Sequence, residues 1–244
     1  MYEIIKLELY KLKKNKMFWG IMIYIILMIP AMLSMAEEET ELQHWNIDQF
    51  FGLINSKTMF ILPFFISNFY SAVIPIGNNA YYFRDLMAFG YKREQVLFGK
   101  VIPTACVSAL FSLLFMISMI VPLILKNCPS EFNSEILPRT IMFVLIMLFY
   151  YFSIAFITDC LVMLIPSPLF IIGMALFENL IIQMPPALGA DISSLKWTIF
   201  YLTLDLSAFN IDLTTILKII IGCSIHLLLV GYISYVTFKK REFK

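Results

Sequence analysis

The stretch 101–125 reads VIPTACVSALFSLLFMISMIVPLIL and contains no charged residue. About twenty apolar residues in an α-helix cross the roughly 30 Å hydrocarbon core of a bilayer, so this stretch predicts a transmembrane helix. Working outward from it, five more apolar runs of similar length are bounded by charged residues, Pro, Gly or Asn. The predicted spans are residues 17–35, 58–77, 101–125, 140–158, 167–183 and 215–238. The sequence therefore predicts an all-α, multi-pass membrane protein in which residues 1–244 form one transmembrane domain.

The composition agrees with a place in the cell membrane. Residues of the set AVILMFWYC make up 60% of the chain, charged residues only 14%, and the mean hydropathy is +0.83. Soluble proteins have about 25% charged residues. The 18 Lys and Arg residues nearly balance 17 Asp and Glu, whereas a nucleic-acid-binding protein needs a basic surplus. We therefore expect membrane lipid, and no nucleic acid, as a partner.

The positions of the basic residues predict the orientation. If the N-terminus is cytosolic, 13 of the 18 Lys and Arg residues fall in cytosolic segments, as the positive-inside rule requires. They are Lys6, Lys11, Lys13, Lys14, Lys16, Arg84, Lys92, Arg93, Lys100, Lys239, Lys240, Arg241 and Lys244. We expect both termini to be cytosolic and a tight cytosolic turn at 159–167. We also expect the span 17–35 to be retained rather than cleaved as a signal peptide, because it has no small-residue cleavage site.

Two segments outside the spans predict helices at the membrane surface. Residues 1–16 place Ile4, Ile5, Leu9 and Leu12 at helical spacing among lysines, which predicts an amphipathic helix along the inner leaflet. Residues 184–214 contain two prolines near their start and then an apolar, aromatic stretch bounded by charged residues. They predict short re-entrant or interfacial helices between the fifth and sixth spans.

The cytosolic segment 78–100 is longer, more charged and more aromatic than a connection requires. Gly90 is suited to end one short helix in a left-handed cap, and Lys92 to Gln95 to begin another that continues into the third span. One interpretation is a solvated loop; the other is a docking surface whose apolar side chains fill a groove of a partner inside a charged rim. The apolar candidates are Tyr82, Phe83, Leu86, Met87 and Phe89, and the rim candidates are Arg84, Asp85 and Arg93.

The combined pattern resembles a known family. Glu8-x-x-Lys11 precedes the first of six spans, and Arg84-x5-Gly90-x2-Arg93-x6-Lys100 follows the second. This resembles the membrane (permease) subunit of a type-2 ATP-binding-cassette (ABC) exporter, of the short kind that serves bacterial lantibiotic immunity, peptide-toxin export and bacitracin resistance. The resemblance implies that a helix within residues 82–95 couples the permease to a cytosolic P-loop ATPase. It also implies pairing with a second permease chain, identical or similar, and export of an amphipathic peptide (toxin, lantibiotic or antimicrobial) or a drug.

Several nucleotide-binding and catalytic motifs are absent from the sequence, which limits the chemistry that we expect of this chain. No GxxxxGK[ST] motif occurs, so we expect ATP and Mg to be bound by the partner ATPase and no cofactor in this chain. The chain also has no HExxH, GxSxG or CxxC pattern, which disfavours an intramembrane enzyme and predicts neither a metal site nor a catalytic residue. A non-transporting membrane immunity or sensor protein remains an open alternative.

Glu178 is the acidic residue that falls well inside a predicted span, with Asn179 beside it. An unpaired carboxylate there costs at least about 2.5–3.5 kcal/mol, so it should be protonated, paired or in contact with water. Two interpretations stay open: a polar point on the translocation path or dimer interface, or an interhelical hydrogen bond that only stabilises the fold. For Asp159 we expect a structural role at the inner membrane interface.

Overall fold

The computed structural model describes residues 1–16, 18–20, 22–23, 27, 80–127, 136–164 and 212–240. These residues are almost entirely helical. The helices are α1 (Tyr2–Lys14), α5 (Ala80–Ala88), α6 (Arg93–Asn127), α7 (Ile136–Leu164) and α9 (Leu213–Lys240). The all-α prediction is thus confirmed for this part of the chain.

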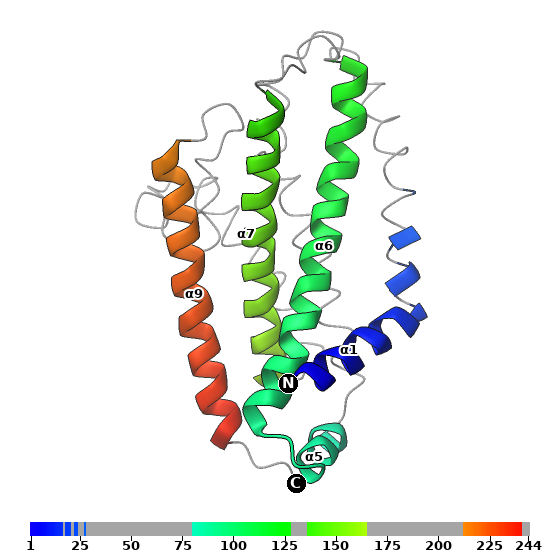
Figure 1. The fold of residues 1–244 in the computed structure, drawn as a ribbon, viewed down its shortest axis with the longest axis vertical. Coiled ribbons are helices and arrows are strands. Elements are labelled where there is room, and N and C mark those ends of the chain that lie inside the picture. The colour runs from blue at the N-terminus through cyan, green and yellow to red at the C-terminus, as the bar shows by residue number, and fades with distance from the viewer. Residues whose placement is uncertain are drawn as a thin grey trace, which may run out of the picture.

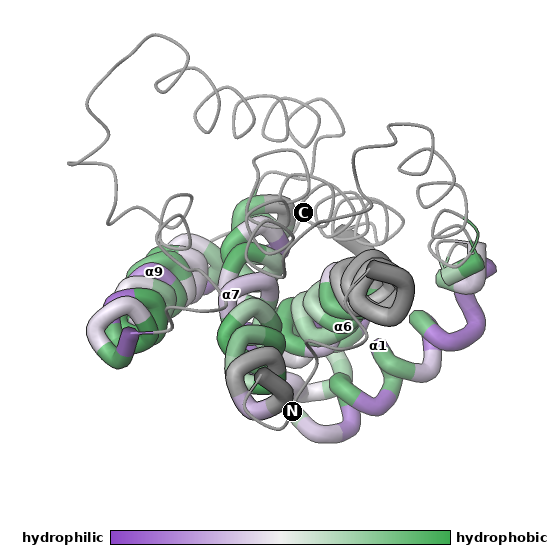
Figure 2. Tube along the Cα trace, turned by 90° about the horizontal axis from the view of Figure 1, so that it is seen from above, coloured by the Kyte–Doolittle hydropathy of each residue, from purple (hydrophilic) through white to green (hydrophobic). Residues whose placement is uncertain are grey.

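Three long helices run lengthwise, with α7 between α6 and α9 and packed against both (Figure 1, Figure 2). Each has the length and apolar composition to cross a membrane, over Arg93–Leu114, Ile141–Leu161 and Leu213–Lys240. They correspond to the predicted spans 101–125, 140–158 and 215–238. The predicted spans 58–77 and 167–183, most of 17–35, and the predicted helices of 184–214 lie outside the described residues.

The turn expected at 159–167 does not begin at residue 159. Helix α7 continues through Asp159 to Leu164. Asp159 carries a charge, but it does not break a helix, and the next residue along the chain that removes a backbone donor is Pro166.

One end of the three long helices carries the shorter ones. Helix α1 crosses beside α6, α5 lies below, and the last turn of α9 ends there too (Figure 1). Arg93 Nη1 donates a hydrogen bond of 2.5 Å to the carbonyl oxygen of Lys239, which joins the start of α6 to the end of α9. We call this end the foot of the bundle. The N-terminal helix and the end of α9 therefore lie on the same side.

A single cluster of buried apolar side chains joins all five helices at the foot. It includes Ile4 from α1, Leu86 from α5, Val101 from α6, Cys160 from α7 and Phe238 from α9. Within a membrane such side chains stabilise the fold by close packing rather than by removal from water. The short helices are therefore packed parts of the core rather than appendages.

Asp212 caps the N-terminus of α9, at the end away from the foot. Its carboxylate accepts hydrogen bonds from the hydroxyl of Thr214 and from the backbone N–H groups of Thr214 and Leu213. This is an N-cap, which supplies acceptors to N–H groups that have no partner within the helix. These hydrogen bonds hold the pKa of Asp212 below its usual range, so the capping charge is present at neutral pH.

Candidate coupling site at the foot of the bundle

A sharp turn connects α5 to α6, and we call residues 80–95 the elbow. Gly90 has φ of 87°, the left-handed conformation that glycine adopts most easily. Its N–H donates to the carbonyl oxygen of Met87 at 3.0 Å, and the N–H of Tyr91 donates to that of Leu86 at 3.2 Å. This pair of bonds is a Schellman motif, so the predicted glycine cap is confirmed.

The first turn of α6 is also closed by the elbow. Gln95 Oε1 accepts a hydrogen bond of 3.1 Å from the N–H of Lys92, and the N–H of Val96 donates to the carbonyl oxygen of Lys92 at 3.1 Å. The reach of a Gln at the third helical position back to the N-cap N–H is half of a capping box. The predicted helix start at 92–95 is confirmed, and α6 continues from it without a break into the span.

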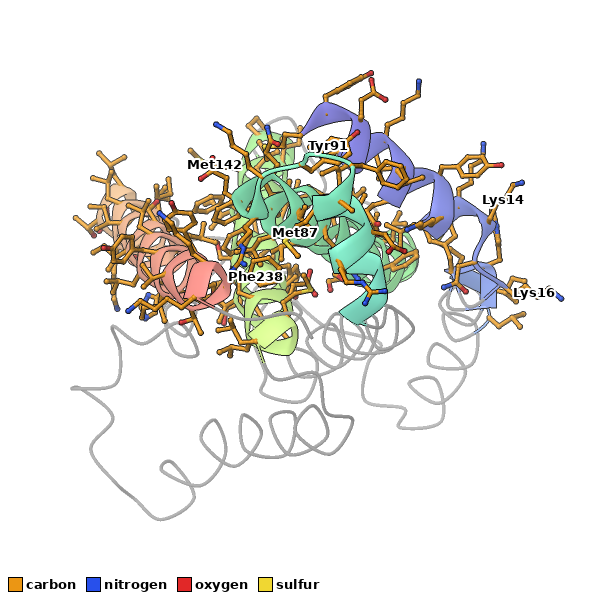
Figure 3. The ribbon with its side chains drawn as sticks, turned by 90° about the horizontal axis from the view of Figure 1, so that it is seen from below. Lys14, Lys16, Met87, Tyr91, Met142 and Phe238 are labelled. Atoms are coloured by element: carbon orange, nitrogen blue, oxygen red, sulfur yellow. The ribbon has the colours of Figure 1, made fainter. Side chains whose placement is uncertain are left out.

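The apolar residues of the elbow differ in where they point. Phe89 is 81% exposed, while Leu86 is buried and Met87 is partly buried against the core cluster. Met87 and Tyr91 are labelled in Figure 3. The prediction that Leu86 fills a groove of a partner is therefore wrong. Its side chain follows the Schellman turn into the core of this chain.

The polar residues of the elbow also divide. Arg84 and Asp85 are exposed, as expected for a rim. Arg93 is only partly exposed and bonds to the carbonyl oxygen of Lys239, so it joins α6 to α9 rather than simply forming a rim. The backbone of Tyr82 and Phe83 belongs to α5, and their side chains lie outside the described part of the structure.

Behind the elbow, three charged side chains from three helices are buried. Glu8 of α1 and Lys100 of α6 are each 2% exposed, and Asp159 of α7 is 1% exposed. Glu8 Oε1 forms an ion pair of 3.2 Å with Lys11 Nζ, and Lys100 interacts electrostatically with Glu8, Lys11 and Asp159. We call these four residues the charge cluster. Buried charges are tolerated only when others compensate them, so the cluster depends on the three helices meeting.

A close approach of α1 to α6 brings Glu8 to the cluster. A Cβ atom on Gly99 would lie 2.9 Å from Cγ2 of Ile4, closer than real Cβ contacts. Ile4, Glu8 and Leu12, spaced four residues apart, form the buried face of α1. This corrects the predicted lipid-facing stripe, since Ile4 and Leu12 pack on protein while Leu9 is exposed.

The sequence alone does not predict the charge cluster. It indicates only a cytosolic cation at Lys100 and a structural role for Asp159. One signal was present: Glu8 lies between Ile4 and Leu12 at helical spacing, and an acidic residue on an apolar face needs a partner. The residues next to Glu8 in the sequence do not indicate that Lys100 of α6 and Asp159 of α7 lie near it.

Other predicted sites have a simpler outcome. Glu178 and Asn179 lie outside the described residues. Within the described residues, His, Cys, Asp and Glu side chains do not gather in groups of three or more that could hold a metal ion.

Comparison with known proteins identifies a family that matches most of the chain. The model of the family described as "ABC-2 family transporter protein" matches residues 4–182, a range that includes the elbow and all four residues of the charge cluster. No curated protein and no solved structure matches the chain.

Proposed function

Since this chain belongs to the ABC-2 transporter family and is a transmembrane subunit of an ABC transporter, we propose that it works as the permease of an ATP-driven exporter. A separate cytosolic P-loop ATPase binds ATP and Mg, and a second permease chain completes the translocation pathway. The cargo is an amphipathic peptide (toxin, lantibiotic or antimicrobial) or a drug that leaves the cell or the membrane. Such export also accounts for immunity against a membrane-active peptide.

The observation that carries this proposal is the exposed tip of the elbow. Phe89 is 81% exposed at the foot of the bundle, next to the exposed Arg84 and Asp85. An aromatic side chain inside a polar rim is typical of binding hot spots. The elbow is therefore a suitable docking surface for the ATPase, with Phe89 as its apolar anchor.

The construction of the elbow supports a coupling role. The Schellman motif and the capping contact of Gln95 hold α5 at a defined angle to α6. Because α6 continues unbroken from the elbow into the span, a push on α5 is transmitted along a rigid helix rather than lost in a loop. We propose that closure of the ATPase pair moves the elbow in this way.

The charge cluster extends this coupling to neighbouring helices. Lys100 lies about one and a half turns beyond the elbow and interacts with charges on α1 and α7. Electrostatic interactions are stronger away from water, so separating these helices is costly. We propose that the foot of α6 moves together with α1 and α7 when the ATPase closes.

The test of docking is Phe89→Asp. Purified under mild detergent with its partner, the wild-type chain is expected to retain a P-loop ATPase. Loss of a hot-spot side chain costs about 2 kcal/mol, so the variant should bind the ATPase roughly thirtyfold more weakly. The measurement is the affinity of the purified permease for the ATPase.

The matched control is Tyr2→Asp, which places the same charge on an exposed aromatic position of α1 outside the elbow. It should leave binding unchanged. Normal ATPase binding by Phe89→Asp would remove the elbow as the docking surface. A functional chain from the native host that never associates with any ATPase would favour the non-transporting alternative instead.

We also propose that Glu178, with Asn179, contributes to the translocation path or the dimer interface. Glu178→Gln keeps the size and hydrogen bonding of the side chain but removes its charge. An ionised carboxylate that contacts a cationic cargo predicts lost transport with normal assembly. Full transport by Glu178→Gln, together with failed assembly of Glu178→Leu, would instead identify a packing role.

A further inference from the structure

An apolar groove of about 810 Å³ lies between α6, α7 and α9 near the foot of the bundle. Its walls include Phe98 and Ile102 of α6, Phe156 of α7, and Leu227 and Gly231 of α9. The rings of Phe98 and Phe156 stack with centroids 6.4 Å apart. The volume is within the range of roughly 300–1,000 Å³ that is typical of ligand sites.

One wall of the groove is formed by a glycine, which leaves space that a side chain would fill. Gly231 lines it, and a Cβ atom there would make ordinary contact with Phe156, 3.6 Å away. A larger side chain at 231 would therefore project into the groove without displacing the backbone. Two other lining residues, Leu228 at 74% and Tyr232 at 68%, are exposed on a membrane-spanning helix, so the groove opens toward lipid.

The end of the groove at the foot is positively charged. Lys239 Nζ lies 5.7 Å from the ring centroid of Tyr235, which lines the groove. Arg93 is held nearby through its hydrogen bond to the carbonyl oxygen of Lys239. Beside these two cationic side chains, the lining contains one carboxylate, that of Glu94. The apolar groove thus ends beside two cationic side chains and one carboxylate.

We propose that this groove binds an anionic phospholipid of the leaflet on the foot side. One acyl chain lies along Phe98, Phe156 and Gly231, and the phosphate lies beside Lys239 and Arg93. Each methylene group removed from water contributes about 0.8 kcal/mol of binding free energy. The acyl chain does not gain this energy here, because it moves from bulk lipid, and not from water, into the groove. Selectivity must therefore come from the cationic end, which favours an anionic headgroup over a zwitterionic one.

The proposal is tested on the full chain reconstituted in vesicles, without ATPase, so its outcome is independent of export. Trp19, Trp45 and Trp197 are replaced by Phe, and Phe98→Trp supplies a single fluorescent reporter in the groove. The vesicles are phosphatidylcholine with a minor fraction of lipid carrying brominated acyl chains, either phosphatidylglycerol or phosphatidylcholine. Bromine quenches tryptophan on contact, so quenching by the phosphatidylglycerol form should be the stronger of the two.

Two pairs of variants separate the groove from the general lipid surface. Gly231→Phe fills the groove and should remove the preference, whereas Leu229→Phe, on an exposed part of α9 outside the groove, should preserve it. Lys239→Gln should weaken the apparent affinity for phosphatidylglycerol roughly fivefold. Lys14→Gln, an exposed lysine on α1, should leave it unchanged.

Three results would overturn the proposal. Equal quenching by both headgroups would show bulk lipid only, and unchanged quenching in Gly231→Phe would place the lipid elsewhere. A disulfide between Leu228→Cys residues of two chains would show that a second copy covers the groove. If Gly231→Phe fails to fold, Lys239→Gln and the headgroup comparison still decide the question.

Discussion

At the scale of single residues, Lys100 is the most consequential side chain that the structure describes. It is buried on α6 and interacts with acidic groups from α1 and α7. Lys100→Met leaves the carboxylates of Glu8 and Asp159 without that cation, and breaking a buried ionic cluster typically costs about 3–5 kcal/mol. We expect a large loss in the free energy of unfolding in detergent, measured by thermal or denaturant unfolding, and little change for the exposed Lys14→Met.

A double-mutant cycle tests whether Glu8 and Lys100 act together. If they do, Glu8→Gln combined with Lys100→Met should destabilise the protein less than the sum of the single changes, because the second change removes a charge that the first left uncompensated. The measurement is the same unfolding free energy. Strict additivity would mean that Glu8 serves only its ion pair with Lys11.

Gly99 gives a second prediction at the residue scale. Gly99→Ala places a Cβ atom 2.9 Å from Ile4, so α1 must move away from α6 or the backbone must shift. Overpacking of this kind typically costs about 1–3 kcal/mol. We expect a lower unfolding temperature in detergent and faster proteolysis of the N-terminal helix. Gly231→Ala is the control, since its Cβ makes only ordinary contact with Phe156; equal behaviour of the two variants would contradict the close approach.

At the scale of elements, the elbow depends on one backbone conformation. A Cβ at Gly90 would meet no atom within 4 Å, so the effect of Gly90→Ala comes from its φ of 87° alone. A left-handed conformation costs a residue with a side chain roughly 1–2 kcal/mol. We expect the angle between α5 and α6 to become less defined, with weaker ATPase binding while α6 stays inserted.

Two companions make this test specific. Gly90→Asn should retain more ATPase binding than Gly90→Ala, because Asn tolerates the left-handed region better. Gly20→Ala adds a methyl group where no atom lies within 4 Å and no positive φ is required, and it should have no effect on binding. Equal binding by all three variants would show that the geometry of the elbow is not used.

At the scale of the whole molecule, α1, α5 and the end of α9 share one side (Figure 1). The excess of basic residues predicts that this side is cytosolic. In a background without Cys106, Cys128, Cys160 and Cys223, we expect Lys92→Cys to react with an impermeant thiol reagent only after the cells are permeabilised. Glu131→Cys should react in intact cells. The reverse pattern would invert the topology.

The sequence by itself determined the features that depend on neighbouring residues. Long apolar runs predicted the helices now seen as α6, α7 and α9, because a span requires only local apolar composition. Gly90, followed by Lys92 to Gln95, predicted the elbow, because caps and turns are satisfied within a few residues. The pattern of residues 84–100 likewise indicated the family that residues 4–182 match.

Only the tertiary structure decided which faces of these helices meet. Helix α7 is apolar almost all round, so its sequence does not indicate which side packs on α6. The meeting of Glu8, Lys100 and Asp159 and the inward turn of Leu86 depend on the approach of residues distant in the chain. The apolar groove with its cationic end depends on the same packing. Local sequence specifies what each segment can bury, but the partners against which it is buried are chosen by the packing of the whole bundle.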